Sequence, residues 1–533
     1  MPERENSFAR RPAFIVASLA ALALGVRLVA LPGQGLWLDE SYSVVLATSP
    51  ASRIIAETEL DNHPPLYYLL LHYWAGLAGA SVISFRLLSV LFGVATVALG
   101  TALARRIAGD RAAVAAGLLL GLSPFLVYYS HEIRQYALLG LECLIATYGL
   151  ALLCRPAGSG GGVTGSPESG SRPYRDAQMR GAMLLGLGSA AALYTMYVGG
   201  LVFGAQVLAA GLVLLRQPRD AARRGLAWLG LATAAVVIAF LPWAPVALRQ
   251  ARHLGAILEP QNAVLKLAAT VLVWLGGYTQ TRHAFFARDR GSLLFLAAAG
   301  ILAAGLLLIT AVAALRRDNR GWAILLLIPT FLPPALLWLI SLRKPMYLTY
   351  CLLPCGVLFL LAGGIALATA RGRRPALAAW SVFALAGLAM YWSAPTFGRG
   401  QTMLNLATWL QAASKPSDTV LFENEWLYLP AEAYARLGHR RLTGGPMLLT
   451  APRVAPTSPL WPPIVPADGL RASLGRLRGR VILVSRAGPN DLRAELVSTL
   501  GRPVREITFP GSHQNPPVTA AVFAASAKVK PGG

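Results

Sequence analysis

Long apolar runs alternate with short polar segments along most of the chain. Several runs contain about 17 residues or more, close to the length of about 20 that a helix needs to cross a bilayer. This pattern predicts a polytopic α-helical membrane protein with about eleven spans. The spans are predicted at 13–31, 82–104, 112–127, a segment that ends at 155, two helices around 194–200 that end at 216, and then 225–241, 292–315, 322–342, 347–370 and 375–392.

Charge is scarce but unevenly distributed. Only 14% of the 533 residues are charged, whereas a soluble protein has about 25%. The net charge is +24, and 20 of the 48 basic residues lie in short segments between apolar runs, at 1–12, 103–112, 154–181, 216–224, 316–320 and 371–374. Basic residues in alternate short loops mark the cytoplasmic side. The excess of cations therefore indicates membrane orientation, with a cytoplasmic N-terminus. No nucleic-acid motif accompanies it, so a nucleic-acid partner is not predicted.

Three segments between or beside the spans differ from ordinary short loops. Residues 32–81 form a long loop on the extracytoplasmic side, with aromatic helical stretches suited to the headgroup level. Residues 156–180 are rich in Gly, Ser, Pro and Arg and are predicted to be a flexible cytoplasmic linker. The apolar segment 264–277 is expected to dip into the outer leaflet, because counting it as a span would move 316–320 outside.

The composition changes near residue 395, where polar residues, prolines and short β-type runs appear. A small α/β domain is therefore predicted at 395–533, after a transmembrane domain at 1–394. An odd number of spans places this domain outside the cell membrane. Strands are expected at 419–422, 481–485 and 518–523, helices at 403–413, 427–437 and 491–500, and an irregular Pro-rich loop at 451–467.

The first long loop, 32–81, carries the most concentrated candidate chemistry. Asp39 and Glu40 are adjacent carboxylates at a membrane exit, where they could serve catalysis or simply stabilise a helix N-terminus. Asp61 and His63 add a carboxylate and an imidazole, and the prolines at 64 and 65 would hold them in place. Asp39, Asp61 and His63 are also candidate ligands of a divalent metal such as Mg²⁺, Mn²⁺ or Zn²⁺, although His63 could equally bond a loop carbonyl.

Two further clusters are predicted at the same membrane face. The turn SHEIRQY contributes Glu132, Arg134 and Tyr136. Arg343 and Lys344 lie between two later spans, in a loop that is predicted to be extracytoplasmic. They are therefore exceptions to the rule that basic residues gather in cytoplasmic loops. These two cations either contact lipid headgroups or form a seat for a lipid phosphate together with Arg134. Carboxylates, a candidate metal ligand and cations at one face suit group transfer from a lipid-linked phosphate.

Two other classes of function compete with an enzyme. A transporter or flippase of a lipid-linked sugar would place ionisable residues near the bilayer midplane and show inverted repeats. Neither feature is visible here, since the acidic residues cluster outside the spans. Loss of these carboxylates would have favoured a non-catalytic subunit with a glycan-binding C-terminal domain, but the carboxylates are present. The enzyme interpretation is therefore preferred.

Several blocks of sequence resemble a known family. LWLDESYS, HPPLYYLLLHYW and SPFLVYYSHEIRQYALL, in this order, resemble the C-type, polyprenyl-phosphate-sugar-dependent membrane glycosyltransferases. The branch related to protein mannosyltransferases and the lipid A aminoarabinose transferase is the most similar, over roughly residues 10–365. The resemblance implies the C-type glycosyltransferase fold, an extracytoplasmic active site in the bacterial inner membrane and a polyprenyl-phosphate sugar donor. It also implies inversion at the anomeric carbon and an envelope glycolipid, glycan or protein as acceptor.

The resemblance also suggests roles for individual residues. Asp39 matches the family's catalytic acidic residue in the first outer loop, with Glu40 orienting it or binding the acceptor. His63 stands where the aminoarabinose enzymes usually carry Lys, so their donor and metal contacts do not transfer to this chain. The other assignments are Asp61, His63, Glu132 and Tyr136 as supporting or acceptor-binding residues, and Arg134, Arg343 and Lys344 as donor-phosphate ligands.

Overall fold

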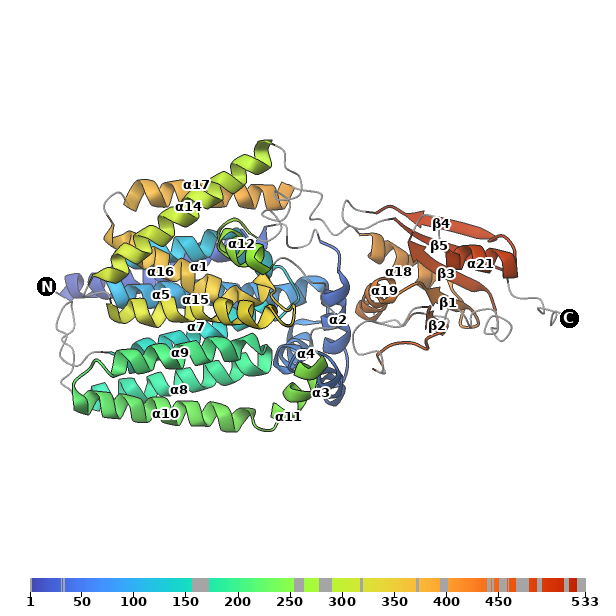
Figure 1. The fold of residues 1–533 in the computed structure, drawn as a ribbon. Helices are drawn as coiled ribbons and strands as arrows, with labels where there is room; N and C mark the ends of the chain where they lie inside the picture. Colours follow the sequence, from blue (N-terminus) through green and yellow to red (C-terminus); the bar gives the residue numbers. More distant parts are fainter. Residues whose placement is uncertain are drawn as a thin grey trace. The chain divides into compact units, whose positions relative to one another are not determined.

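Helices and strands follow the hydrophobic pattern closely in the computed structural model of this protein (Figure 1). Two compact units are present. The helical unit contains Met1–Val29, His63–Tyr67 and Leu87–Trp392, and the mixed unit contains Ala30–Asn62, Tyr68–Arg86 and Ser393–Gly533. The structure describes residues 2–29, 31, 34–155, 172–253, 263–277, 290–316, 320–370, 373–393, 401–438, 442, 445–449, 458, 460–465, 479–486, 491–511 and 517–524.

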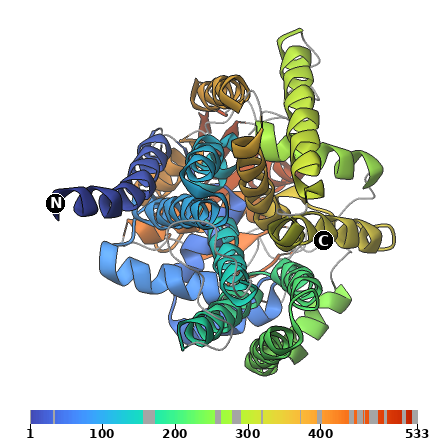
Figure 2. The ribbon, with the colours of Figure 1, turned by 90° about the vertical axis from the view of Figure 1, so that its left-hand side faces the viewer.

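The helical unit is a bundle of long apolar helices. Figure 2 looks nearly along most of their axes. Seven helices in the described part of the chain are long and apolar enough to cross a membrane, and two shorter apolar helices accompany them. The helices are α1 (Pro2–Leu28), α5 (Val82–Leu122), α6 (Pro124–Ser130), α7 (Tyr136–Leu153), α8 (Arg172–Thr195), α9 (Val198–Leu214), α10 (Arg219–Phe240), α11 (Ala244–His253), α12 (Ala263–Gly276), α14 (Arg290–Leu315), α15 (Arg320–Ser341), a 3₁₀ turn (Thr349–Leu352), α16 (Leu353–Thr369) and α17 (Arg373–Ser393).

Helix α5 contains two of the predicted spans. Its 41 residues would extend about 60 Å, roughly twice the thickness of the hydrocarbon core. The backbone leaves the helical conformation at Ala108 and Gly109, and Gly109 has a φ of 79°. Only glycine adopts such a φ without strain, so this position allows a sharp change of direction between two helices. The polytopic helical class is confirmed, and the number of eleven spans stays a prediction.

Two predicted boundaries in the bundle are wrong. The helix predicted at 112–127 is interrupted at Ser123, because Ser123 Oγ accepts the Leu126 N–H as an N-cap and Pro124 then begins α6. The predicted linker 156–180 is helical from Arg172 onward, where α8 begins, and 156–171 lie outside the described residues. Helix α12 has 14 residues, about 21 Å, so it is shorter than a span as expected.

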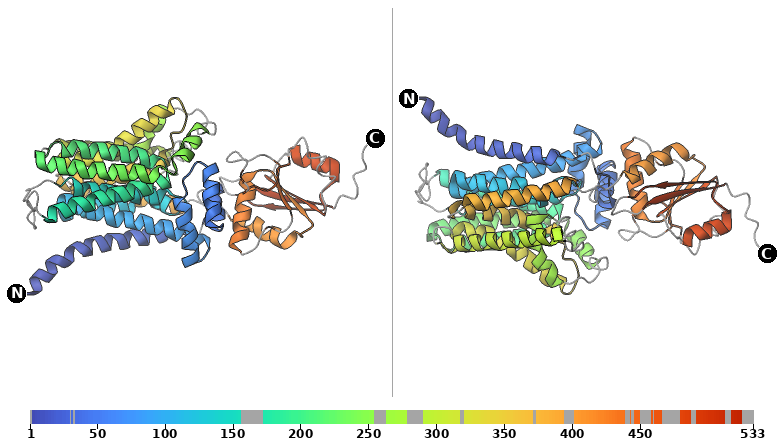
Figure 3. Two further views of the ribbon diagram at one scale, coloured as in Figure 1. Left: turned by 90° about the horizontal axis from the view of Figure 1, so that it is seen from below. Right: turned by 90° about the horizontal axis from the view of Figure 1, so that it is seen from above.

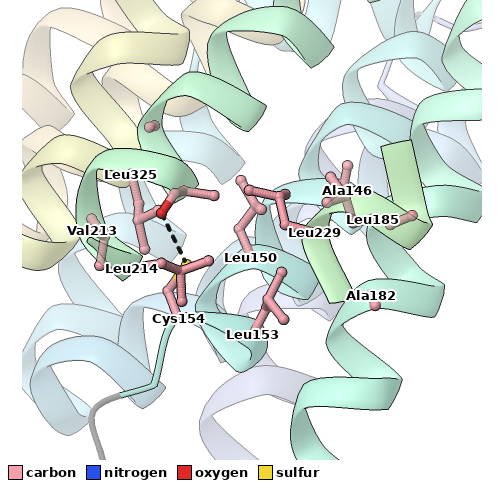
Figure 4. Close-up of a cluster of buried hydrophobic side chains, with 13 residues drawn as sticks. Ala146, Leu150, Leu153, Cys154, Ala182, Leu185, Val213, Leu214, Leu229 and Leu325 are labelled. Atoms are coloured by element: carbon pink, nitrogen blue, oxygen red, sulfur yellow. Dashed lines mark hydrogen bonds between the residues drawn. The ribbon is translucent and has the colours of Figure 1, made fainter. Parts of the chain in front are cut away.

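Small residues let α7 and α8 pack closely. A Cβ added at Gly149 would lie 2.6 Å from the Gly181 carbonyl oxygen, and the converse contact is the same length. Such close backbone approach is typical of helix pairs in membranes. Figure 4 shows the apolar cluster beside this contact, where the Cys154 Sγ lies 4.0 Å from the Ala210 carbonyl oxygen. Its other members include Leu150, Leu153, Leu185, Leu214, Leu229 and Leu325.

The mixed unit contains a five-stranded sheet with the order β2-β1-β3-β5-β4. Strands β1, β2 and β3 are parallel, and β5 runs antiparallel to both β3 and β4. Helices α18 and α19 cover one face and α21 covers the other (Figure 3). The elements are α2 (Leu38–Ala47), α3 (Ala51–Leu60), most of α4 (Leu66–Ala78), α18 (Thr402–Ala413), β1 (Thr419–Phe422), α19 (Glu425–Leu437), β2 (Gly445–Leu448), β3 (Val481–Arg486), α21 (Asp491–Leu500), β4 (Arg505–Phe509) and β5 (Val518–Phe523).

The α/β fold predicted for the C-terminal region is confirmed, with two strands added, whereas the predicted domain bounds of 1–394 and 395–533 stay a prediction. The three expected strands coincide with β1, β3 and β5, which are almost wholly buried. Strands β2 and β4 lie at the two edges of the sheet and are more exposed than the other three strands. Within the predicted Pro-rich loop, residues 458 and 460–465 are described. They contain no strand, although Ile464 forms one isolated bridge to Leu448.

Candidate active site

The adjacent acidic pair lies in the first turn of α2. Trp37 is extended and precedes the helix, and its carbonyl accepts the Ser41 N–H and hydroxyl. Carboxylates in a first turn interact favourably with the helix dipole, which favours a helix starting here. The two side chains nevertheless differ in burial, since Asp39 is partly exposed and Glu40 is completely buried. Asp39 is therefore the member of the pair that is more accessible to a substrate.

Glu40 forms a buried ion pair with Arg86, and neither side chain is exposed to solvent. Arg86 Nη2 lies 3.1 Å from Oε2 and 3.3 Å from Oε1 of Glu40. The same guanidinium donates to the carbonyls of Gln34, at 2.7 Å, and Leu31, at 3.3 Å. Arg86 thus connects the segment before α2 to the first turn of that helix. Arg86 was not among the site residues predicted from the sequence.

Asp61 and His63 lie at the turn that follows α3. Asp61 ends that helix, with its N–H donating to the Glu57 carbonyl at 3.1 Å, and only 6% of the residue is exposed. His63 is half-buried and is followed by the buried Pro64 and Pro65, before α4 begins at Leu66. Proline fixes φ and disfavours helix in the preceding residue, which explains why α3 and α4 are separate helices.

In the helical unit, the turn that carries Glu132 and Arg134 is anchored through Arg27 and His131. His131 Nε2 lies 2.7 Å from the Arg27 carbonyl oxygen, so this nitrogen must donate. In a neutral ring Nδ1 then accepts the Tyr391 hydroxyl, 3.0 Å away. The Arg27 side chain completes the link, because its Nε donates to Ser130 Oγ at 3.1 Å. These contacts assign His131 a structural role.

Arg134 and Tyr136 lie together in this turn. The guanidinium carbon of Arg134 is 5.9 Å from the centre of the Tyr136 ring, within cation–π range. Tyr136 also contacts Tyr129 and Tyr350 edge-on, with ring centres 5.1 and 5.3 Å apart. Glu132 is buried, and its carbonyl accepts the Ser89 hydroxyl at 2.7 Å. The predicted turn therefore forms a well-packed cluster of charged and aromatic side chains.

Arg343 and Lys344 follow the end of α15, and both are exposed. Lys344 Nζ donates to the Ala251 carbonyl near the C-terminal end of α11, at 3.1 Å, where a cation is favourable. Lys266 of α12 donates to the carbonyl of the nearby Tyr347 at 3.4 Å. Lys266 was not predicted as a site residue, because it lies within an apolar segment. Lys344 therefore has a structural contact in addition to its proposed role.

The predicted site residues are divided between the two units. The mixed unit contains Asp39, Glu40 and Asp61, and the helical unit contains His63, Glu132, Arg134, Tyr136, Arg343 and Lys344. Among the residues that the structure describes, no three His, Cys, Asp or Glu side chains gather as a metal ion would require. The prediction that Asp39, Asp61 and His63 bind a divalent metal gains no support from this arrangement.

Comparison with known proteins finds a local match to one family and similar folds among solved structures. Residues 62–159 match the model of the dolichyl-phosphate-mannose-protein mannosyltransferase family. No curated protein sequence matches the chain. Among solved structures, ArnT from Cupriavidus metallidurans in the apo state has a TM-score of 0.64 at 14% identity, covering 95% of this chain and 97% of that chain. The same protein bound to undecaprenyl phosphate has a TM-score of 0.62 at 15% identity, covering 97% and 99%.

A third similar structure is the apo oligosaccharyltransferase from Archaeoglobus fulgidus, with a TM-score of 0.50 at 13% identity. It covers 89% of this chain and 69% of that chain. At these identities the structural matches establish the fold, and the family match adds the HPP and SHEIRQY segments. This chain therefore shares its fold with these structures, and its residues 62–159 match the mannosyltransferase family model.

Proposed function

We propose that this protein is a glycosyltransferase that moves one sugar from a polyprenyl-phosphate donor, such as an undecaprenyl-phosphate sugar, onto a hydroxyl-bearing acceptor. The observation that carries the proposal is the contrast within the acidic pair of α2. Glu40 is buried against Arg86, whereas the Asp39 carboxylate is partly exposed. A carboxylate held on a fixed helix beside a buried ion pair is suited to act as a general base. The ArnT structure with bound undecaprenyl phosphate supports the donor class.

The reaction is a single displacement with inversion. Asp39 accepts the proton of the acceptor hydroxyl as its oxygen attacks the anomeric carbon. The bond between that carbon and the donor phosphate oxygen breaks, and polyprenyl phosphate leaves with the electron pair. General-base catalysis of this kind contributes about 10²–10⁴-fold to a rate. Glu40 acts in this mechanism through its pairing with Arg86, which fixes the first turn of α2.

Cations stabilise the charge that develops on the leaving phosphate. Arg134, Arg343 and Lys344 are the proposed donor-phosphate ligands. The aromatic contact between Arg134 and Tyr136 supports this assignment, because it fixes the direction of the guanidinium. Arg343 is exposed and therefore accessible to a ligand. Asp61, His63, Glu132 and Tyr136 are the proposed supporting or acceptor-binding residues.

The proposed setting is the bacterial inner membrane, with a cytoplasmic N-terminus. The active site and the domain at 395–533 would then be extracytoplasmic. The distribution of basic residues supports this orientation, because the short basic segments alternate with the apolar runs. The acceptor is proposed to be an envelope glycolipid, glycan or protein that carries a free hydroxyl.

Replacing Asp39 by Asn tests the base directly. The amide keeps the size of the side chain but cannot accept the proton, so turnover should fall by about 10²–10⁴-fold. Purified protein in lipid nanodiscs would be assayed with a panel of undecaprenyl-phosphate sugars, following release of undecaprenyl phosphate. The panel would be chosen by mass analysis of envelope glycolipids and glycoproteins from a deletion strain. Donor binding should be retained.

A matched control is Asp110→Asn, which makes the same change at a carboxylate that pairs with Arg105. Asp110 lies beside the break within α5 and has no proposed role in the reaction. Its turnover should remain within about twofold of the wild-type rate, as for most surface substitutions. Near-normal turnover in Asp39→Asn, with equal amounts of protein in the membrane, would refute the proposed base.

A further inference from the structure

The C-terminal domain contacts the helix that carries Asp39. The Tyr434 hydroxyl of α19 accepts the Leu36 N–H at 2.8 Å, three residues before Asp39. Both partners are buried or nearly so, and burial raises the pKa of the Tyr434 phenol. Tyr434 therefore stays neutral at physiological pH and satisfies a backbone N–H just before the helix begins. This hydrogen bond fixes the entry to α2.

A second contact holds the other end of α2. Arg436 Nη1 donates to the Val45 carbonyl and to Ser49 Oγ, both at 3.1 Å. The carbonyls at a helix C-terminus lack helical partners and carry partial negative charge, so a guanidinium is well suited to bind them. Arg436 Nε also donates to Glu432 Oε1 at 2.7 Å, which fixes the guanidinium on α19.

A third contact extends the interface to the next helix of the loop. The Ser458 hydroxyl donates to the Glu57 carboxylate of α3, which is 2% exposed. This serine belongs to the same C-terminal domain, and Glu57 in turn pairs with Arg53 at 3.4 Å. Helices α2 and α3 are each joined to the domain by polar contacts. Apolar packing alone would leave these helices freer to slide along their axes.

We propose that Tyr434 and Arg436 are positioning residues for the glycosyl transfer, and that the C-terminal domain is part of the catalytic machinery. Helix α2 has only ten residues, and α19 holds it near both ends. Loss of either contact would let the helix shift or rotate, which would move the Asp39 carboxylate. A misplacement of about 1 Å costs about 10²-fold in rate. The inference that Asp39 is the group being positioned rests on its proposed function as the general base.

The simplest competing explanation is that these contacts only stabilise the C-terminal domain. A purely stabilising contact would change the melting temperature or the amount of folded protein, with kcat per folded molecule preserved. A positioning contact predicts a loss in kcat at an unchanged donor KM, because binding the donor does not require the base. The two explanations therefore differ in a measurement made on correctly folded, full-length protein.

The first experiment compares Arg436→Gln with Arg493→Gln in the full chain. Arg493 is a matched control, because it pairs with Glu506 at 2.5 Å within the same domain but lies on α21. We expect Arg436→Gln to lower kcat by about 10–100-fold with donor KM within about threefold. Arg436→Lys should recover part of the rate, since lysine keeps the positive charge but lacks the planar guanidinium that donates two hydrogen bonds at once. Arg493→Gln should leave both constants nearly unchanged.

Tyr434→Phe is a second variant that tests the same proposal if Arg436→Gln fails to fold. Phenylalanine keeps the ring and its packing and removes only the acceptor of the Leu36 N–H. Its kcat should fall by about 3–10-fold, as expected for the loss of a neutral hydrogen bond. If Tyr434→Phe and a folded Arg436→Gln variant both keep kcat within twofold of wild type, the positioning proposal is wrong.

A double-mutant cycle separates this inference from the proposed function. In the Asp39→Asn background Arg436→Gln should lower kcat no further, because the base that it positions is already absent. A full additional loss there would contradict positioning of Asp39. If Asp39→Asn alone keeps normal turnover, the proposed base is refuted. A selective kcat loss in Arg436→Gln would then still support a positioning role for Arg436, but the group that it positions would be another residue of α2.

Discussion

Each unit of the molecule contains a fully buried arginine, and the two are satisfied in different ways. Arg86 in the mixed unit faces the carboxylate of Glu40, at 3.1 Å. Arg27 in the helical unit donates instead to Ser130 Oγ and to backbone carbonyls, including that of Gly121 at 3.0 Å. Within the described residues, Arg27 forms no ion pair with a carboxylate. Both side chains have 0% exposure, so the difference does not come from solvent.

The two environments impose different constraints on the sequence. A buried ion pair is neutral as a unit, and removing one partner leaves an uncompensated charge. A guanidinium surrounded by carbonyl dipoles depends on several weaker contacts, so no single substitution removes all of its stabilisation. Arg86 binds the segment that leads into α2, and Arg27 binds the turn that contains Glu132 and Arg134. Each arginine thus supports candidate site residues of its own unit.

The largest effect is expected from breaking the ion pair. Glu40→Gln leaves Arg86 buried without its counter-ion, which typically costs about 3–5 kcal/mol of folding free energy. The melting temperature of the purified protein and its level in the membrane should both fall clearly. Fluorescence-detected gel filtration after heating would measure the first quantity. A Glu40→Gln protein as stable as wild type would show that the pair is not needed for stability.

The matched control for this prediction removes both charges together. The double variant Glu40→Leu with Arg86→Met replaces the pair by apolar side chains of similar size. Such replacements of buried ion pairs are often neutral or stabilising, so most of the lost stability should return. If the double variant is less stable than Glu40→Gln, the hydrogen bonds from Arg86 to Gln34 and Leu31 contribute more than the ion pair does.

A smaller effect is expected when the network around Arg27 is disturbed through Gly93 of α5. A Cβ at this position would lie 2.3 Å from Ser130 Oγ and 2.9 Å from Arg27 Nε. Gly93→Ala should therefore separate these two groups and cost about 1–3 kcal/mol through overpacking. The melting temperature again provides the measurement. Gly211→Ala on α9 is the control, because a Cβ there meets nothing within 4 Å.

The two glycines should respond in opposite directions if the network matters. Alanine in an open helical position is stabilising by up to about 1 kcal/mol relative to glycine, which is the expectation for Gly211→Ala. A similar stabilisation in Gly93→Ala would mean that Ser130 can move away at no cost. The Arg27 contact to Ser130 would then contribute little, and the carbonyl contacts would carry the stabilisation of this arginine.

Much of the fold could be predicted from the sequence, because long apolar runs and buried strands leave a strong pattern. Strands β1, β3 and β5 are mostly apolar, and their predicted bounds agree with the structure to within a residue. Strands β2 and β4 were not predicted, because edge strands are more exposed to solvent and therefore carry a weaker apolar pattern. Strand β2 also begins with Gly-Pro, which is unfavourable in a strand interior.

The site could be predicted only in part. Asp39 and Glu40 were identifiable because adjacent carboxylates beside a bilayer are rare and costly. The ion pair between Glu40 and Arg86 was not predicted, because the two residues lie 46 positions apart in sequence. The contact of Arg436 with Val45 spans 391 residues and has no local signature at all. A sequence shows which residues are charged, whereas the fold decides which of them meet.

The smallest effect in this series is expected at a partly exposed pair, Asp418 with Arg480 in the C-terminal domain, where Nη2 lies 2.6 Å from Oδ2. Burial alone would raise the pKa of Asp418. Hydrogen bonds from the Arg480 side chain and from the N–H groups of Lys415 and Arg480 outweigh burial and hold the pKa below its ordinary value. The arginine is about one-third exposed, so solvent screens the pair, and Asp418→Asn should cost only about 1 kcal/mol.

The pH dependence follows from the sign of this shift. Because the folded-state pKa is lower than the unfolded value of about 3.9, the contribution is complete above that value. It is lost as the pH falls through the folded-state pKa. Hydrogen exchange of β1 and β3 peptides in the full-length protein would measure the opening free energy at pH 7 and near pH 3. The difference in opening free energy between wild type and Asp418→Asn should shrink at the lower pH. An equal difference at both pH values would contradict the lowered pKa of Asp418.

The control is Glu506→Gln, at a pair in which both members are about one-third exposed. This change should alter stability by less than about 0.5 kcal/mol.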